Sequence, residues 1–246
     1  MRLAVIADIH GNVLALEAVL KDVATRRVDM TIDLGDCVSG PLWPRETFEL
    51  LDKLKLPTVR GNHDRALGAP RSLTPAPDSW ETFAQAELPT VAFQALANLP
   101  AVLRPLPGVL AFHASPDDDN TYFLEDIVDG ELRLASNTAI NERVGATVAD
   151  LLLCGHSHLP QVVQVGPRLI VNPGSVGCPA YTDPTPPRHV SEAASPHARY
   201  AILDNSAGPW HADLIAITYD WTRAAARARK NNWPRWATAL ETGRVG

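Results

Sequence analysis

The chain has 246 residues, enough for one large domain or two small ones with a sizeable buried core. A hydrophobic content of 46% and a charged content of 20% are ordinary for a globular protein, and a net charge of −6 argues against a protein that coats nucleic acid. No apolar run is long enough for a membrane span or a signal peptide, and the three cysteines are scattered, with no CxxC pair. We therefore expect a cytoplasmic protein without disulfides, and the sequence leaves its oligomeric state open, a homo-oligomer included.

The first part of the chain alternates between strand and helix patterns. Short runs of aliphatic residues predict buried strands within 2–7, 28–36 and 56–64. Between them, apolar residues at helical spacing predict a helix within 12–27, and a second helix begins near Pro44. This alternation indicates a largely parallel sheet with helices on its faces.

The remaining elements are less regular. Residues 65–100 contain several prolines and two helix patterns, at 80–87 and 90–98, and we expect a helical insertion there. The later elements are strands within 108–113 and 150–156 joined by a helix within 136–148, a hairpin within 161–171, strands within 199–204 and 210–218, and a helical tail over 219–246 that breaks at Pro234. The polar, proline-rich stretch 183–198 is predicted to be a long loop.

Side chains that can bind a metal stand at the ends of the first five predicted strands. They are Asp8, His10, Asp36, Asn62, His63, Asp64, His113, His156 and His158. In an open parallel α/β sheet, ligands bind beyond the carboxyl ends of the strands, so these side chains are expected at one edge. A lone HxH pair is more often two solvated imidazoles, and a lone strand-end aspartate is usually a cap or turn residue. Five such strand ends together favour a metal site instead.

The types of these side chains indicate which metals and substrates the site would accept. Carboxylate, imidazole and amide oxygen, with no thiolate, suit divalent Mn, Fe, Zn, Co or Ni. Seven candidate ligands are too many for one ion and suit two ions that share a bridging carboxylate. Two divalent ions outweigh the charge of two aspartates, so the site would stay cationic and bind an anion, for which a phosphate ester is the natural candidate.

The order of these motifs resembles the calcineurin-like metallophosphoesterase superfamily. The motifs are DxH (Asp8, His10), GD (Gly35, Asp36), GNHD (61–64), a lone His113 and GHxH (155–158), followed by NPGSVG at 172–177, a loop typical of the superfamily's small bacterial phosphoesterases. The resemblance implies an α/β fold: an αββα sandwich of two mixed β-sheets flanked by helices. The chain would be a single metallophosphoesterase domain over 1–246, with a helical insertion at about 65–100 and a C-terminal helical tail at about 219–246.

The resemblance also implies a role for each candidate residue. Asp8, His10 and His158 would bind the first metal, Asn62, His113 and His156 the second, and Asp36 would bridge both; manganese is favoured among the metals above. A metal-bound hydroxide would be the nucleophile. His63 would protonate the leaving-group oxygen, and Asp64 would fix the orientation of His63 and stabilise its charged form. The partner would be a small-molecule phosphate ester, with a nucleotide one candidate.

Departures from the superfamily's patterns bear on the substrate. The segment GDCVSG (35–40) lacks the phosphate-clamping arginine of the superfamily's Ser/Thr protein phosphatases, which favours phosphodiesters over monoesters. The alternatives are a phosphomonoesterase (a protein phosphatase or a dinucleoside polyphosphate hydrolase) and a non-catalytic metal-binding interaction scaffold. His189 lies outside the motifs and is interpreted as a surface or turn residue. The tryptophan- and arginine-rich tail is expected to pack as a capping helix, in preference to binding nucleic acid.

Overall fold

The computed structural model describes residues 1–69 and 79–246. Strands from both ends of the chain form the first of its sheets. In the order β13-β12-β1-β2, the strands are β1 (Arg2–Ile6), β2 (Met30–Asp33), β12 (Ala198–Asp204) and β13 (His211–Ile217). β1 pairs parallel with β2 and antiparallel with β12, and it is buried on both faces, as its unbroken aliphatic run predicts.

The second sheet packs against the first. Its order is β3-β4-β7-β9-β8, with β3 (Val102–Leu103), β4 (Val109–Phe112), β7 (Leu151–Leu153), β8 (Gln161–Val165) and β9 (Arg168–Asn172). Successive side chains of a strand point to opposite faces, so Val5 of β1 belongs to the apolar cluster between the sheets with Leu151, whereas Ile6 belongs to the outer cluster with Leu16. Each such fully buried aliphatic side chain stabilises the fold by about 1.5–3 kcal/mol.

Helices cover the outer faces of both sheets. The helices beside the first sheet are α1 (Val13–Val23), α2 (Pro44–Leu54), α7 (Trp221–Lys230) and α8 (Pro234–Thr242), and α6 (Asn137–Val144) covers the second. α7 and α8 meet at the predicted break, and Trp236 is 6% exposed in the cluster that includes α1, so the tail is a packed cap as expected. These layers confirm the predicted fold class. Among the described residues, no helix combines the length and apolar character that a bilayer crossing requires.

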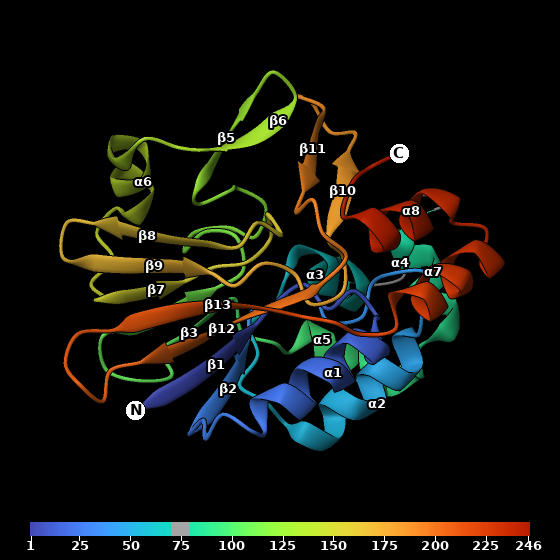
Figure 1. Cartoon of the computed structure of the whole chain (residues 1–246), viewed down its shortest axis with the longest axis horizontal. Helices are drawn as coiled ribbons and strands as arrows, with labels where there is room; N and C mark the ends of the chain where they lie inside the picture. The colour runs from blue at the N-terminus through green and yellow to red at the C-terminus, as the bar shows by residue number, and fades with distance from the viewer. Residues whose placement is uncertain (70–78) are drawn as a thin grey trace.

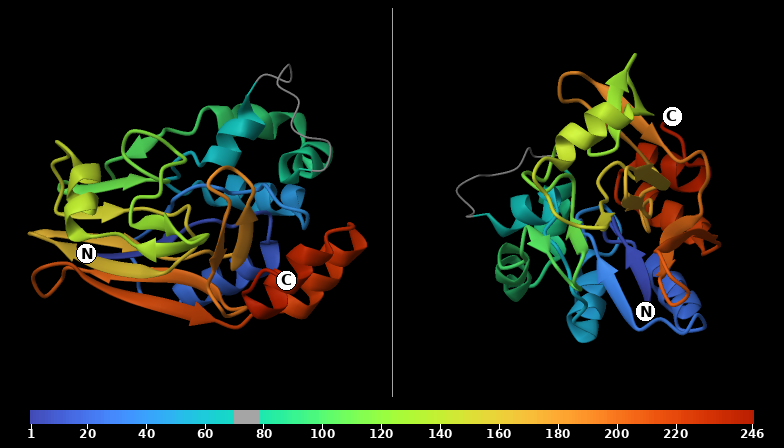
Figure 2. Two further views of the ribbon diagram at one scale, coloured as in Figure 1. Left: turned by 90° about the horizontal axis from the view of Figure 1, so that it is seen from above. Right: turned by 90° about the vertical axis from the view of Figure 1, so that its left-hand side faces the viewer.

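Three further helices form a separate group. They are α3 (Asn62–Gly68), α4 (Trp80–Glu87) and α5 (Thr90–Ala97). Their apolar side chains form one cluster with Val38, which follows β2, and with Phe48, which lies in α2. Figure 2 shows this group on one side of the molecule and α7 and α8 on the other. The helices predicted at 80–87 and 90–98 are confirmed.

The strand predicted within 56–64 is wrong. Thr58 makes only an isolated parallel bridge with Asp33, and the chain turns into α3 at Asn62. The short apolar run therefore reaches the sheet at one position, and the GNHD motif begins a helix. Asn62, the first residue of α3 (Figure 1), still lies at the expected edge, because its Oδ1 is 3.1 Å from Nε2 of His113.

A third sheet was not predicted. Its order is β10-β11-β6-β5, with β5 (Glu125–Val128), β6 (Glu131–Leu134), β10 (Ala180–Asp183) and β11 (His189–Glu192). The long loop predicted at 183–198 is therefore wrong, because β11 falls within it. The buried positions of β11 are His189 and Ser191, so the alternation typical of a strand carries no apolar signal here.

Candidate metal centre

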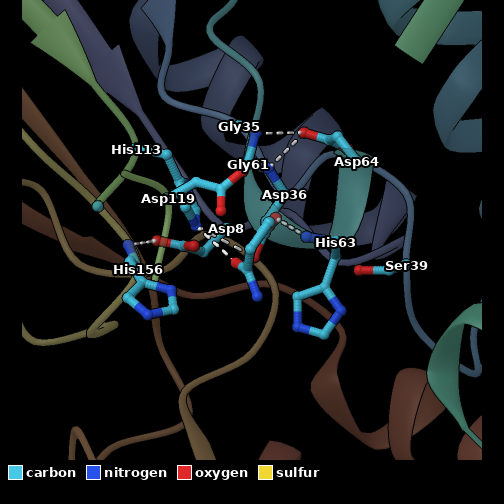
Figure 3. Close-up of polar contacts among 12 residues, drawn as sticks. Asp8, Gly35, Asp36, Ser39, Gly61, His63, Asp64, His113, Asp119 and His156 are labelled. Carbon is cyan, nitrogen blue, oxygen red and sulfur yellow. Dashed lines mark hydrogen bonds and ion pairs between the residues drawn. The ribbon is translucent and has the colours of Figure 1, made fainter. Parts of the chain in front are cut away.

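Two groups of side chains that could each hold a metal ion lie where the strands of both sheets end. Asp8, His10 and His158 form one group, and Asp36, His113 and His156 form the other. Within each group one ligand atom per residue lies within 4.8 Å of the others, and five of the six residues are fully buried. Figure 3 shows Asp8, Asp36, His113 and His156 converging from separate loops. The strand-end positions thus bring these predicted residues together.

The backbone is strained at most of these positions. Asp8, His10, Asp36, His156 and His158 all have a positive φ, between 48° and 68°. Non-glycine residues rarely adopt this conformation, which costs on the order of 1–3 kcal/mol each and persists only where the surrounding structure enforces it. Here the loops after β1 and β2 are joined by hydrogen bonds, including those from the Asp8 and His10 N–H groups to the Gly35 and Asp36 carbonyls, both 3.0 Å. The strained turns direct the side chains toward one point.

Two motif glycines are required by close approach. A Cβ atom at Gly61 would lie 2.0 Å from Oδ1 of Asp36, and one at Gly155 would lie 3.0 Å from Oδ2 of Asp8. The Asp36 carboxylate could not keep its position beside a larger residue at Gly61, and the Asp8 carboxylate would be tightly crowded by one at Gly155. These glycines therefore make room for the candidate ligands.

Backbone carbonyls fix which ring nitrogen faces the centre. Nδ1 of His10, His113 and His158 donates to the carbonyls of Ser39 (2.9 Å), Leu34 (2.8 Å) and Cys178 (2.6 Å), so their Nε2 atoms face inward. His156 is reversed, because its Nε2 donates to the Asn120 carbonyl at 2.9 Å and leaves Nδ1 for the centre. Metal-binding histidines characteristically have their second nitrogen held in this way.

The atoms that face inward fit a cation. Nε2 of His10 and Nε2 of His158 are 3.2 Å apart, and the buried Oδ1 of Asp8 lies 3.4 Å from Nε2 of His158. In the other group, Nε2 of His113 lies 3.1 Å from Oδ1 of Asn62 and 3.3 Å from Oδ2 of Asp36. Lone pairs this close repel one another unless a proton or a metal ion lies between them. The oxygen and imidazole donors suit a borderline divalent ion.

The pKa values divide the four histidines into two pairs. Burial lowers the pKa of His10 to about 3 and that of His156 to about 4, so both rings are neutral and can act as ligands at neutral pH. Burial also opposes a charge on His113 and His158, but the neighbouring carboxylates override it. Asp36 raises the pKa of His113 to about 10, and Asp8 raises the pKa of His158 well above its usual value. A divalent ion would have to displace the protons of the second pair.

His63 lies beside this centre with partners from α4. Its side chain is 21% exposed, its Nδ1 is 2.5 Å from Oε1 of Glu81, and its ring stacks on Trp80 with centroids 5.0 Å apart. Burial works against a charged ring, yet the carboxylates of Asp36 and Glu81 prevail and raise the pKa of His63. The ring is thereby held in one plane and favoured in its protonated form.

The role predicted for Asp64 needs correction. Its carboxylate accepts hydrogen bonds from the backbone N–H groups of Asp36 (2.8 Å), Cys37 (3.0 Å) and Gly61 (3.0 Å), and it points away from the His63 ring (Figure 3). Asp64 is in the first turn of α3, where an acidic side chain folds back to cap the helix. It therefore shapes the loop that carries Asp36, and Glu81 is the carboxylate that contacts His63. Nothing in the spacing of GNHD indicates a partner from α4.

A second set of contacts, also missed by the sequence reasoning, supports the GHSH loop. The Tyr122 ring stacks on His156 at 4.8 Å, and the Tyr181 hydroxyl donates to the His156 carbonyl at 3.2 Å. His189, interpreted from sequence as a surface or turn residue, is 4% exposed, and its Nε2 lies 2.7 Å from the Tyr122 hydroxyl. The surface interpretation is wrong because β10 and β11 fold over the centre. None of these residues belongs to a motif that could have revealed them.

A cavity of about 760 Å³ opens beside the centre. Its inner wall includes Asp36, Asn62, His63, His156 and His158. Its outer walls come from the start of α4, the segment 120–127 and the segment 181–189. The candidate metal centre thus faces a space large enough for an organic ligand.

The fold and the two donor groups define an α/β protein with candidate divalent-metal sites. The sequence profile of the calcineurin-like phosphoesterase superfamily domain matches residues 1–190. The chain belongs to this superfamily, whose members use divalent metals, and the predicted resemblance is confirmed.

The most informative relatives match nearly the whole chain. An uncharacterised protein of Methanocaldococcus jannaschii is 27% identical over 261 residues, which cover 95% of this chain and 94% of that protein. The crystal structure of a metallophosphoesterase from Sphaerobacter thermophilus is 27% identical with a TM-score of 0.76, covering 99% of this chain and all of that one. A hypothetical protein from Pyrococcus horikoshii, 19% identical, has a TM-score of 0.78 over 100% of this chain and 99% of its own, and shows the shared fold.

Proposed function

We propose that the protein is a dinuclear metal-dependent phosphodiesterase. The observation that carries the diester preference is the charge of the cavity wall. Among the described residues that line it, Arg143 is the one guanidinium, and it is held by Asp126 and by the carbonyls of Phe123 and Glu125. No arginine of the described wall is thus free to bind the second charge of a monoester dianion, whereas a diester carries a single charge.

The proposed ligand sets follow the two donor groups. Asp8, His10 and His158 would hold the first ion, Asn62, His113 and His156 the second, and Asp36 would bridge them, with manganese favoured over Fe, Zn, Ni or Co. When bound, the two ions would polarise the phosphoryl oxygens and lower the pKa of water toward neutrality.

The chain's own residues would move the proton to the leaving group. His63 lines the cavity with its Nδ1 bound by Glu81, so Nε2 is the nitrogen available to protonate a leaving oxygen. Trp80 holds the plane of the ring, and Glu81 favours the protonated form. Glu81 therefore takes the supporting role that the sequence assigned to Asp64.

The test is hydrolysis of bis-p-nitrophenyl phosphate beside p-nitrophenyl phosphate with added manganese, together with the metal content of the protein. We expect diester turnover to exceed monoester turnover, with two ions bound per chain. Dominant monoester turnover would favour the phosphomonoesterase alternative, and bound metal with no turnover of either ester would favour the interaction scaffold.

Two further assignments complete the proposal. The first sheet joins β1 and β2 to β12 and β13, which supports one domain over 1–246, and α3, α4 and α5 support a helical insertion at about 65–100, of which 70–78 lie outside the described residues. The three cysteines are buried and free, which supports a reducing cytoplasmic location.

A further inference from the structure

The cavity beside the metal centre is much larger than the centre itself needs. Its volume of about 760 Å³ falls in the range of about 300–1,000 Å³ that holds organic ligands. The proposed chemistry takes place at one edge of it, at the side chains of Asp36, Asn62 and the site histidines. The rest of the cavity must therefore contact the organic substituents of the ester, and its lining determines which substituents fit.

Carboxylates dominate the charge of the outer wall. Glu125, Asp126 and Asp183 all line the cavity; burial raises the pKa of Glu125 to about 7, and Asp126 is paired with Arg143, so Asp183 is the carboxylate of the three that is neither buried nor paired with a guanidinium. The Asp183 side chain is 32% exposed, and no Lys or Arg of the described chain pairs with it. Its Oδ1 accepts the Thr185 N–H at 2.8 Å, and its Oδ2 is 4.0 Å from Nε2 of His189. Asp183 thus presents an anionic charge to the ligand.

The neighbouring groups suit an uncharged, polar substituent with a flat face. Trp80, Trp233 and Tyr122 contribute aromatic rings to the lining, and Asn120 and Thr182 contribute polar side chains. Aromatic rings stack on bases and other planar groups, and a carboxylate accepts hydrogen bonds from hydroxyl groups. A second phosphate in the same place would meet Asp183 without a cation to offset the repulsion.

We propose that Asp183 makes the cavity selective for phosphodiesters that carry one phosphate and uncharged, nucleoside-sized substituents, and that it excludes substrates with a second phosphate group. This inference rests on the proposed phosphodiesterase function and names its substrate class. It excludes the dinucleoside polyphosphates among the substrates that the sequence left open.

The test uses two esters that differ only by one phosphate. Thymidine 5′-(p-nitrophenyl phosphate) and its 3′-phosphorylated counterpart both release p-nitrophenol, so the ratio of their kcat/KM values isolates the effect of the added charge. We expect the wild-type protein to prefer the first ester by on the order of tenfold, the size of one poorly screened like-charge contact. Asp183→Asn keeps the Oδ1 acceptor for Thr185 and should bring the ratio close to one, mainly by faster turnover of the doubly phosphorylated ester.

The control is Asp129→Asn, because Asp129 lies in the turn between β5 and β6 and does not line the cavity. It should leave the ratio unchanged. The inference is overturned if Asp183→Asn leaves the ratio as it is in the wild type, or if the wild-type protein prefers the 3′-phosphorylated ester. If no ester is hydrolysed, bis-p-nitrophenyl phosphate included, the proposed function fails and the inference fails with it.

Discussion

The contact between Glu81 and His63 makes a prediction that separates proton transfer from folding. In the wild-type protein, Nδ1 of His63 lies 2.5 Å from Oε1 of Glu81. Glu81→Gln keeps the shape of this side chain but removes its charge. A hydrogen bond to a charged group contributes about 1.5–3 kcal/mol. If that contribution no longer stabilises the protonated ring, the pKa of His63 falls, and at alkaline pH the protonated fraction, and kcat with it, falls by roughly 10- to 150-fold, since each 1.36 kcal/mol is a factor of ten.

The assay compares two diesters with different leaving groups. p-Nitrophenolate departs from bis-p-nitrophenyl phosphate without a proton, whereas the sugar alkoxide of dithymidine monophosphate requires one. Glu81→Gln should therefore slow the dinucleotide by the full factor and the nitrophenyl ester far less, with metal content unchanged. Glu87→Gln is the matched control, because Glu87 is on the same helix but does not line the cavity.

The pH profile gives a second readout of the same change. Glu81 helps to raise the pKa of His63, so its removal lowers that pKa. Because a general acid must be protonated, the alkaline loss of dinucleotide hydrolysis should move to lower pH in Glu81→Gln. Equal losses for both esters, with an unmoved pH profile, would refute the role of Glu81 and leave it a structural residue.

The remaining predictions concern the metal centre. Asp36→Asn should lose both ions and all turnover together, measured by metal analysis and bis-p-nitrophenyl phosphate hydrolysis; retention of two ions would contradict the bridging role. Mn²⁺ ions must displace the protons that Asp36 stabilises on His113 and Asp8 on His158. The Mn²⁺ affinity of each site should therefore rise by up to about tenfold per pH unit between pH 6 and 9, and calorimetry should detect the released protons. A pH-independent affinity would contradict this assignment. Gly61→Ala should weaken Mn²⁺ binding, because its Cβ would lie 2.0 Å from Oδ1 of Asp36, and wild-type affinity would show that the loop adapts.

The candidate metal centre could be predicted from sequence because its geometry depends on strand ends. The aliphatic runs of β1, β4 and β7 are unambiguous, and His113 follows β4 directly. Parallel pairing of these strands within their sheets then fixes where the next residues lie. The incorrect strand prediction at 56–64 does not change the predicted position of Asn62. The helix α3 begins at the same edge and places Oδ1 of Asn62 3.1 Å from Nε2 of His113.

The supporting residues could not be predicted, because packing between distant segments places them. His189 reaches the Tyr122 hydroxyl from β11, which pairs with β10 along its length and with β6 at Val190 and Glu131. β11 buries the polar residues His189 and Ser191, and β6 alternates Leu132 and Leu134 with charged residues but leaves Leu134 58% exposed, so neither strand has the pattern of a strand with one buried apolar face. Asp64 illustrates the opposite error: its place in the motif suggested a partner for His63, but its position in the first helical turn directs it to the backbone instead.

The position of α4 joins two functions that are commonly assigned to separate parts of an enzyme. Trp80 and Glu81 line the cavity that would hold the substrate's organic group, and both also contact His63. A change in the packing of α4 would therefore alter the fit of the substituent and the orientation of the proton donor together. Phe48 of α2 and Leu67 of α3 are in the apolar cluster that holds this helix. Substitutions there should lower kcat as well as raise KM, although neither side chain lines the cavity.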